Sequence, residues 1–267
     1  KINLDNLEIS NNKKLDDYFL IFGTDKGFLD GKKTFYKISK TSPEIKFSNY
    51  KDWILRNDIY GFDYEVGQNF TPVYEKFFEN IKLEKLDILE IGVAGGHSHA
   101  SWYKYFPNSN IYGIDIRPEK DFLYSGRRLK YYQIDILDKN QVDKFLKKGL
   151  KFDIIIDDSL HTHDAFIANL FNFFTSLKSN GLFFLEDFVH QDIRLERLRS
   201  YNQKHGKKLT KYNLTMEEVL NNLSKKNIFK SDYISEDKQI NLHNNIKDLE
   251  INKLDYPDAG VAVIRKK

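Results

Sequence analysis

The 267-residue sequence contains no cysteine, which excludes disulfide bonds, thiolate nucleophiles and cysteine-based zinc sites. It also lacks long apolar runs. The longest, residues 154–156 and 181–185, are far shorter than the roughly 20 apolar residues of a membrane span. The first ten residues have neither the basic nor the apolar region of a signal peptide. We therefore expect a cytoplasmic protein without a membrane span.

A dominant charge is also missing. The 42 Lys and Arg residues nearly balance 39 Asp and Glu residues, for a formal net charge of +3, and the two signs are interleaved along the chain. Such a pattern provides no basic stripe for nucleic acid, so we expect no nucleic-acid partner. The 40% of hydrophobic residues is ordinary for a soluble globular chain with a substantial core.

The middle third of the sequence alternates short apolar runs with segments of helical spacing. This alternation predicts an α/β fold, a Rossmann-like, doubly wound and mostly parallel sheet covered on both faces. The predicted strands are residues 86–91, 111–116, 129–134, 152–156 and 181–185, and the helices between them are residues 98–106, 140–148 and 163–177.

The flanking segments have a different character. We predict helices at residues 13–22 and 71–80, separated by an irregular insertion at residues 28–69. Residues 1–80 would form an N-terminal helical lid with this insertion, and residues 81–267 the core. Residues 191–226 would make a helical excursion from the core, and residues 239–243 and 260–265 a closing antiparallel hairpin.

Acidic residues stand at the end of all five predicted strands. Ligands of an open parallel sheet bind beyond the carboxyl ends of its strands. Loops are polar in any case, which explains some of these acids, but a complete set suits a ligand with hydroxyls, amines and positive charge. The acids are Glu90, Asp115, Asp135, the pair Asp157 and Asp158, and the pair Glu186 and Asp187.

The first strand is followed by a glycine turn, "EIGVAGGHS", at residues 90–98. Its glycines allow close approach of backbone and ligand, but their spacing is not the G-x-G-x-x-G pattern that cradles a pyrophosphate. Asp115, at the end of the second strand, could accept both hydroxyls of a ribose. A glycine turn ringed by acids fits S-adenosylmethionine, which has a ribose and a sulfonium cation but no phosphate.

The stretch "LDILEIGVAGGHSHASWYKYFPNSNIYGIDIRP" resembles the opening motifs of class I S-adenosylmethionine-dependent methyltransferases. More narrowly, the chain is similar to the macrolide-sugar (mycinamicin-type) and bacterial glycan O-methyltransferases. The motifs that carry this narrower resemblance are "GTDKG", "YEKFF", "WYKYFP", "IDDSLH" and "LEDF". The resemblance covers roughly residues 18–27 and 70–190.

This resemblance implies a set of cofactor-binding positions. Asp115 would hold the ribose and Asp135 would lie beside the adenine amine. Lys26, in an N-terminal segment folded over the cofactor, could pair with its carboxylate. Asp157 would face the cofactor or support its loop. The remaining positions that the resemblance assigns to the cofactor are Thr24, Glu90, Gly92 and Gly96.

The resemblance also implies a Mg²⁺ site formed by Glu75, Asp158 and Asp187, with His161 as the catalytic base. Oxygen ligands are those that Mg²⁺ prefers, and an imidazole can accept a proton near neutral pH. The simpler alternatives are a loop cap for Asp158 and a surface position for His161. Relatives have Gly-Ser where this chain has Ser159 and Leu160, which restricts the loop before the histidine.

The leading hypothesis is an enzyme that methylates a sugar hydroxyl in a precursor of a bacterial surface glycan or natural product. Two alternatives stay open: methylation of a phosphoramidate or phosphate oxygen on a glycan precursor, and a non-catalytic S-adenosylmethionine-binding protein. The expected partner is a small-molecule or glycan-precursor acceptor, and a homodimer is left open.

Overall fold

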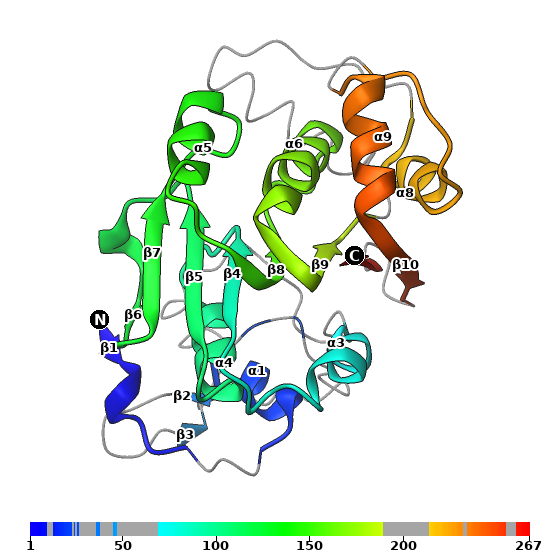
Figure 1. The fold of residues 1–267 in the computed structure, drawn as a ribbon. Helices are drawn as coiled ribbons and strands as arrows, with labels where there is room; N and C mark the ends of the chain where they lie inside the picture. The colour runs from blue at the N-terminus through cyan, green and yellow to red at the C-terminus, as the bar shows by residue number, and fades with distance from the viewer. Residues whose placement is uncertain are drawn as a thin grey trace. The chain divides into compact units, whose positions relative to one another are not determined.

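A computed structural model describes residues 1–9, 13–22, 24, 26, 36–37, 45–46, 69–188, 214–231, 234–254 and 260–267. The chain divides into two compact units, Lys1–Gln133 and Ile134–Lys267. Each unit is described by itself below. The chain contains a seven-stranded, mostly parallel sheet, to which both units contribute strands (Figure 1).

The first unit contributes three parallel strands in the order β4-β5-β7. Their bounds are β4 (Asp87–Ile91), β5 (Asn110–Asp115) and β7 (Leu129–Gln133). The register pairs Glu90 with Gly113 and Ile91 with Ile114, which sets the end of β4 beside the end of β5. Two short sheets accompany them, β1 (Ile2–Asn3) with β6 (Tyr124–Ser125), and β2 (Tyr36–Lys37) with β3 (Ile45–Lys46).

Helices α1 (Leu15–Phe22), α3 (Thr71–Phe78) and α4 (His97–Tyr105) pack together through aromatic side chains. Trp102 of α4 lies at the centre, with its ring edge-on to Phe19 of α1 and Tyr74 of α3 at centroid distances of 5.1 Å each. All three side chains are buried. Aromatic pairs in this geometry stabilise a core beyond the burial of their area, so the helix at the N-terminal end of the chain is tied to the helix that follows the glycine turn.

The second unit contributes four strands in the order β10-β11-β9-β8. The pair β8 (Phe152–Asp157) and β9 (Leu177–Glu186) is parallel, whereas β11 (Gly260–Lys266) is antiparallel to both β9 and β10 (Ile246–Lys253). Strands β8 and β9 are buried over most of their length, as expected for the interior of an α/β sheet. The helices of this unit are α5 (Lys139–Leu146), α6 (His163–Phe173), α8 (Met216–Ser224) and α9 (Glu236–Asn245).

The predicted fold class is confirmed, including the C-terminal antiparallel hairpin. The prediction that residues 239–243 form one strand of that hairpin is wrong, because they lie within α9. Gln239, Leu242 and His243 are buried at helical spacing, and the Gln239 amide bonds the backbone of Phe229. The true partner of β11 is β10, whose charged sequence IKDLEINK suits the edge of a sheet.

The start of α4 also differs from the prediction. The predicted helix at residues 98–106 begins one residue earlier, at His97 after Gly96, so that Ser98 lies in the first turn. The Ser98 hydroxyl instead donates to the buried Glu90 carboxylate over 2.9 Å. The hydroxyl of Ser98 therefore ties the first turn of α4 to the end of β4.

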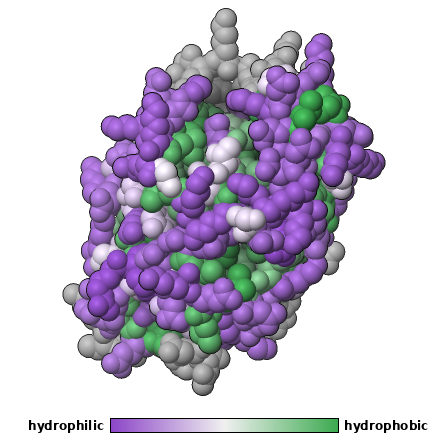
Figure 2. Space-filling view, in the orientation of Figure 1, coloured by the Kyte–Doolittle hydropathy of each residue, from purple (hydrophilic) through white to green (hydrophobic). Residues whose placement is uncertain are grey.

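Several predictions fall on residues outside the described ranges. These are Gly23, Asp25 and Gly27 of "GTDKG", most of the insertion at residues 28–69, and residues 191–213 of the helical excursion. The proposed boundary between residues 80 and 81 stays a prediction. No helix within the described ranges has both the length and the apolar character needed to cross a membrane. Hydrophilic residues dominate the face shown in Figure 2, with smaller hydrophobic areas between them.

Candidate active site

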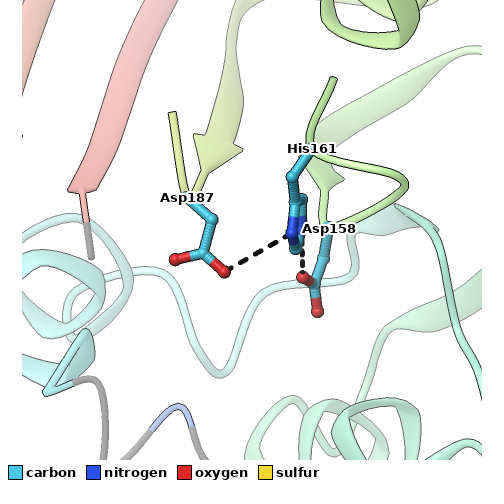
Figure 3. Close-up of side chains that lie close together, drawn as sticks. All are labelled: Asp158, His161 and Asp187. Carbon is cyan, nitrogen blue, oxygen red and sulfur yellow. Dashed lines mark hydrogen bonds and ion pairs between the residues drawn. The ribbon is translucent and has the colours of Figure 1, made fainter. Parts of the chain in front are cut away.

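Three predicted site residues of the second unit lie together as an acid–histidine cluster, formed by Asp158, His161 and Asp187 (Figure 3). The imidazole stands between the two carboxylates. Its Nε2 lies 2.9 Å from Oδ1 of Asp158, and its Nδ1 lies 3.6 Å from Oδ2 of Asp187. Side-chain exposure falls from 25% for Asp158 to 13% for His161 and 4% for Asp187. The cluster is thus partly shielded, with an opening at Asp158.

The backbone around the cluster adopts uncommon conformations. His161 and Asp187 have φ values of 54° and 55°, in the left-handed region that residues with a side chain seldom occupy. The loop without glycine, Ser159 and Leu160, therefore still turns sharply, and the left-handed residue is the histidine itself. Such conformations cost free energy and concentrate at functional sites, which supports a functional role for the cluster.

Asp187 and His161 are held in place by contacts with two different elements of the second unit. Asp187 follows β9 directly, and its backbone amide donates to the carbonyl of Gly260 at the start of β11 over 2.8 Å. The His161 ring stacks against Phe166 of α6, at a centroid distance of 6.1 Å and an angle of 24°. Strand β11 thus helps to position Asp187, although the two are far apart in sequence. The hydrophobic pattern of the sequence did not predict this contact.

Asp157 is not one of the cluster residues, which agrees with the alternation of side chains along a strand. It is fully buried, and both of its carboxylate oxygens accept from Nδ2 of Asn169 in α6 over 3.0 Å. Burial raises the pKa of Asp157 from 3.8 to about 6, although hydrogen bonds from Ser159 and Asn169 act in the opposite direction. These contacts agree with the loop-supporting role considered for Asp157, and its contact with a cofactor stays a prediction.

The donor atoms of the cluster suit a small divalent cation. One ligand atom from each of Asp158, His161 and Asp187 can be chosen so that all three lie within 4.8 Å of one another. Two of the three are carboxylates, the ligands that Mg²⁺ favours. Glu75, the third carboxylate of the predicted site, lies in α3 of the first unit, where its Oε1 accepts from the Leu15 amide over 3.4 Å. Its participation in a metal site stays a prediction.

In the first unit, Glu90 is surrounded by donors from the protein. Its carboxylate is completely buried and accepts from Nδ1 of His99 over 2.6 Å, from Ser98 and from the Trp102 indole over 3.2 Å. The ammonium group of Lys26 lies 4.0 Å away and is also buried. Glu90 thus anchors the glycine turn and the N-terminal segment from within. A direct contact with a cofactor stays a prediction for both Glu90 and Lys26.

Asp115 is half-buried and holds the glycine turn from the neighbouring strand. Its two oxygens accept the backbone amides of Ala94 over 2.7 Å and of Arg117 over 2.9 Å. Ala94 lies at φ 49°, and the flanking Gly92 and Gly96 also have positive φ. A carboxylate has about four lone-pair sites, so these two bonds leave acceptor capacity for a pair of ribose hydroxyls.

Gly96 has a packing role that the sequence did not reveal. A Cβ atom at this position would lie 2.6 Å from the ring of Phe122, a residue of the segment between β5 and β6. The next residue, Leu123, donates its amide to the carbonyl of Gly95 over 3.0 Å. The absent side chain therefore makes room for Phe122, and approach of a cofactor to Gly92 or Gly96 stays a prediction.

The two remaining predicted cofactor positions have local roles in the structure. Thr24 is buried, and its hydroxyl accepts from the Lys26 amide over 3.4 Å. Asp135, in the second unit, accepts the Leu137 amide over 2.9 Å in the turn before α5. The contacts of Thr24 and Asp135 with a cofactor stay predictions.

Sequence reasoning missed several side chains that support the site. Ser98, His99 and Trp102 enclose Glu90, and Asn169 holds Asp157. Asn169 could have been found, because it stands three residues after Phe166 and one before Leu170, on the apolar face of its helix. A polar residue at such a position needs a buried partner.

Several curated relatives match less than half of the chain. Mycinamicin VI 2''-O-methyltransferase from Micromonospora griseorubida is 30% identical over 125 residues, covering 44% of this chain and 31% of the relative. A tetracenomycin-C rhamnosyl 3'-O-methyltransferase from Streptomyces olivaceus is 29% identical over 130 residues, covering 44% and 32%. Demethylmacrocin O-methyltransferase from Streptomyces fradiae is 28% identical over 125 residues, covering 44% and 31%. The chain thus matches about a third of the length of these relatives.

Among solved structures, the MycE methyltransferase of mycinamycin biosynthesis, in complex with Mg, SAH and mycinamycin VI, matches with a TM-score of 0.52. The match is 22% identical and covers 80% of this chain and 53% of MycE. The chain has the MycE methyltransferase fold. The predicted resemblance to sugar O-methyltransferases is therefore confirmed, although no protein-family model matches the chain.

Proposed function

We propose that the chain is an S-adenosylmethionine-dependent O-methyltransferase that acts on a hydroxyl of a sugar or sugar-containing precursor. The observation that carries this proposal is the acid–histidine cluster, in which His161 stands between two carboxylates at the ends of adjacent strands. The relatives with similar sequence are all O-methyltransferases, and their printed substrates include sugar units of natural products.

His161 is the base of the proposed reaction. An alcohol must lose its proton as the new carbon–oxygen bond forms, and an imidazole with an ordinary pKa of about 6.5 accepts protons near neutral pH. Asp158, on Nε2, orients the ring and stabilises the charge that it gains on protonation. The sulfonium group of S-adenosylmethionine supplies the methyl group.

Asp158 and Asp187 would hold Mg²⁺, with Glu75 proposed as the third carboxylate. When bound, the cation lowers the free energy of negative charge on the acceptor oxygen. With the cation held there, Asp158 and Asp187 would orient the acceptor, and Asp115 would accept the ribose hydroxyls of the donor. Alignment of the acceptor oxygen with the methyl group then supplies much of the rate acceleration.

Methyl transfer is tested by incubating the protein with S-adenosylmethionine, Mg²⁺ and a panel of nucleotide-activated, phosphorylated and glycosylated sugars. Release of S-adenosylhomocysteine is the measured quantity. We expect release with at least one sugar acceptor and a loss of rate when EDTA removes the cation. Undiminished activity in EDTA would contradict the metal assignment, and a chain that binds neither donor nor product would contradict the function.

Donor binding is tested separately by calorimetry. Asp115→Ala removes the acceptor of the Ala94 and Arg117 amides together with the proposed ribose contact, so affinity for S-adenosylmethionine should fall by at least about 100-fold, the loss of two or more charged hydrogen bonds. Asp121→Ala, an exposed acid in the same segment of the chain, is the matched control. Equal affinity of the two variants would remove Asp115 from the donor site.

The acceptor, the location and the assembly state are proposed at a coarser level. A precursor of a bacterial surface glycan or of a natural product, a cytoplasmic location and a homodimer stay predictions. No contact in the described residues favours methylation of a phosphate or phosphoramidate oxygen over that of a hydroxyl.

A further inference from the structure

Helix α6 carries a buried amide in a face that is otherwise apolar. Asn169 has no exposed surface, and its neighbours on this face, Phe166, Leu170 and Phe173, are also buried. An apolar residue at position 169 would pack this face without the cost of removing an amide from water. A specific hydrogen-bonding role therefore accounts for the asparagine better than packing does.

The contacts of Asn169 enclose the first acid of the cluster. Its Nδ2 lies 3.0 Å from each carboxylate oxygen of Asp157 and 3.0 Å from Oγ of Ser159, the residues immediately before and after Asp158. The Ser159 amide also donates to Asp157 Oδ1 over 3.3 Å. One side chain of α6 thus holds the side chains of the residues on both sides of Asp158.

The orientation of the Asn169 amide lowers the stability of the fold. Its Oδ1 is buried and has no hydrogen-bond partner among the described residues. Leaving a buried acceptor unpaired costs about 1–3 kcal/mol, so the arrangement is maintained at the expense of stability. Unsatisfied buried groups in a folded protein ask for a functional explanation, and here the N–H groups are directed at the strand end that presents Asp158.

We propose that Asn169 is a positioning residue, which fixes the end of β8 so that Asp158 points at the Nε2 atom of His161. Asp157 and Asp158 point to opposite faces of the strand, so a fixed Asp157 determines the direction of its neighbour. Asn169 acts through Asp157 and Ser159 and touches none of the reacting groups. The activity part of this proposal rests on the proposed methyltransferase function.

The test compares Asn169→Ala and Asn169→Leu, whose side chain branches as asparagine does but has no polar atoms, with Asn172→Ala, a half-exposed asparagine of the same helix. Loss of a residue that orients a metal or acid–base site lowers activity by about 10–100-fold. We expect this loss in kcat for both Asn169 variants, a KM for S-adenosylmethionine within about twofold of the wild type, and no change for Asn172→Ala. A residue with only a structural role would lower kcat in proportion to the folded fraction, which circular dichroism measures.

A second readout does not depend on activity. In the metal-free protein, the ring nitrogens of His161 are observed by ¹H–¹⁵N NMR and assigned by their absence in His161→Gln. The signal of Nε2 should shift in both Asn169 variants and stay in place in Asn172→Ala. If the wild type transfers no methyl group, the proposed function fails, yet this shift still decides whether Asn169 positions Asp158 and His161.

Unchanged kcat and unchanged His161 signals in folded Asn169 variants would overturn the proposal. If those variants do not fold, Ser159→Ala decides instead, because Ser159 is half-exposed and its loss removes one contact of the amide. One hydrogen bond corresponds to about a 3–10-fold effect, so we expect kcat to fall by that factor. Full activity of Ser159→Ala would then overturn the proposal.

Discussion

The acids Glu90 and Asp158 both lie at the carboxyl end of a strand, but their surroundings are opposite. Glu90 is fully buried, bonded to three side chains of α4 and close to the Lys26 ammonium group. Asp158 keeps 25% of its side-chain surface exposed and lies with Asp187 around one histidine. The first carboxylate is neutralised by the protein itself, whereas the second pair concentrates negative charge that a cation could balance. An acid at the end of a strand is therefore structural or chemical according to what surrounds it.

The largest effect is expected when the histidine is removed from the acid–histidine cluster. In His161→Ala the proposed base is lost, and general-base catalysis typically contributes 10²–10⁴-fold, so kcat should fall by about that factor. Affinity for S-adenosylmethionine should change little, because the proposed contacts with the donor are made by other residues. Steady-state kinetics and calorimetry measure both quantities.

His163→Gln is the control for this experiment, since His163 is a buried histidine two residues away at the start of α6. It should keep kcat within about threefold, the scale of a single neutral hydrogen bond. Full activity of His161→Ala would mean that His161 is not the base. The different surroundings of Asp158 and Glu90 would then not indicate different functions.

Glu90→Ala tests the other half of the comparison. Removal of this carboxylate takes away the negative group that lies 4.0 Å from the buried Lys26 ammonium group. It also takes away the acceptor of the His99 hydrogen bond. Breaking a buried pair by deleting one partner costs about 3–5 kcal/mol, so the free energy of unfolding should fall by that amount. Denaturation in urea measures the change.

Glu79→Ala serves as the matched control, because Glu79 forms an ion pair with Lys82 over 2.8 Å but keeps 57% of its side chain exposed. An exposed pair contributes about 0–1 kcal/mol, so this variant should remain near the wild type. Equal effects at the two positions would show that burial does not separate the two kinds of acid.

The elements could be predicted from sequence because their signals are local. Apolar runs such as IIID in β8 and the helical spacing of α6 place strands and helices to within a few residues. The failure at residues 239–243 has the opposite cause. A short run with a glutamine fits strand and helix equally, and the bonds of the buried Gln239 side chain to the distant Phe229 backbone could not be predicted from local sequence.

The acid–histidine cluster could be proposed from sequence because a family motif carried it, whereas its geometry could not. The left-handed backbone of His161 and the bond from Asp187 to Gly260 depend on a loop without glycine and on a strand more than 70 residues later. The role of Gly96 was equally hidden. A glycine beside a turn suggests a ligand, yet the space is occupied by the ring of Phe122.

The smallest expected effect is the pH dependence of stability that Asp157 contributes. Asp157 is a buried acid of the second unit and can be compared with Glu90. It is as deeply buried as Glu90, but its partner in α6 is the neutral amide of Asn169. Burial raises its pKa from 3.8 to about 6, so the folded state holds this proton more tightly than the unfolded state. Between about pH 4 and 6 the unfolded chain releases the proton first, and the contribution of Asp157 to the free energy of unfolding therefore falls as the pH rises.

Above about pH 6 this loss is complete and amounts to about 3 kcal/mol at most. The measurement is urea denaturation in EDTA at several pH values between 4 and 7, for the wild type and for Asp157→Asn, so that the contributions of all other groups cancel in the difference. The wild type should lose stability relative to the variant as the pH rises. A constant difference would show that the hydrogen bonds from Asn169 and Ser159 compensate fully for the burial of the Asp157 carboxylate.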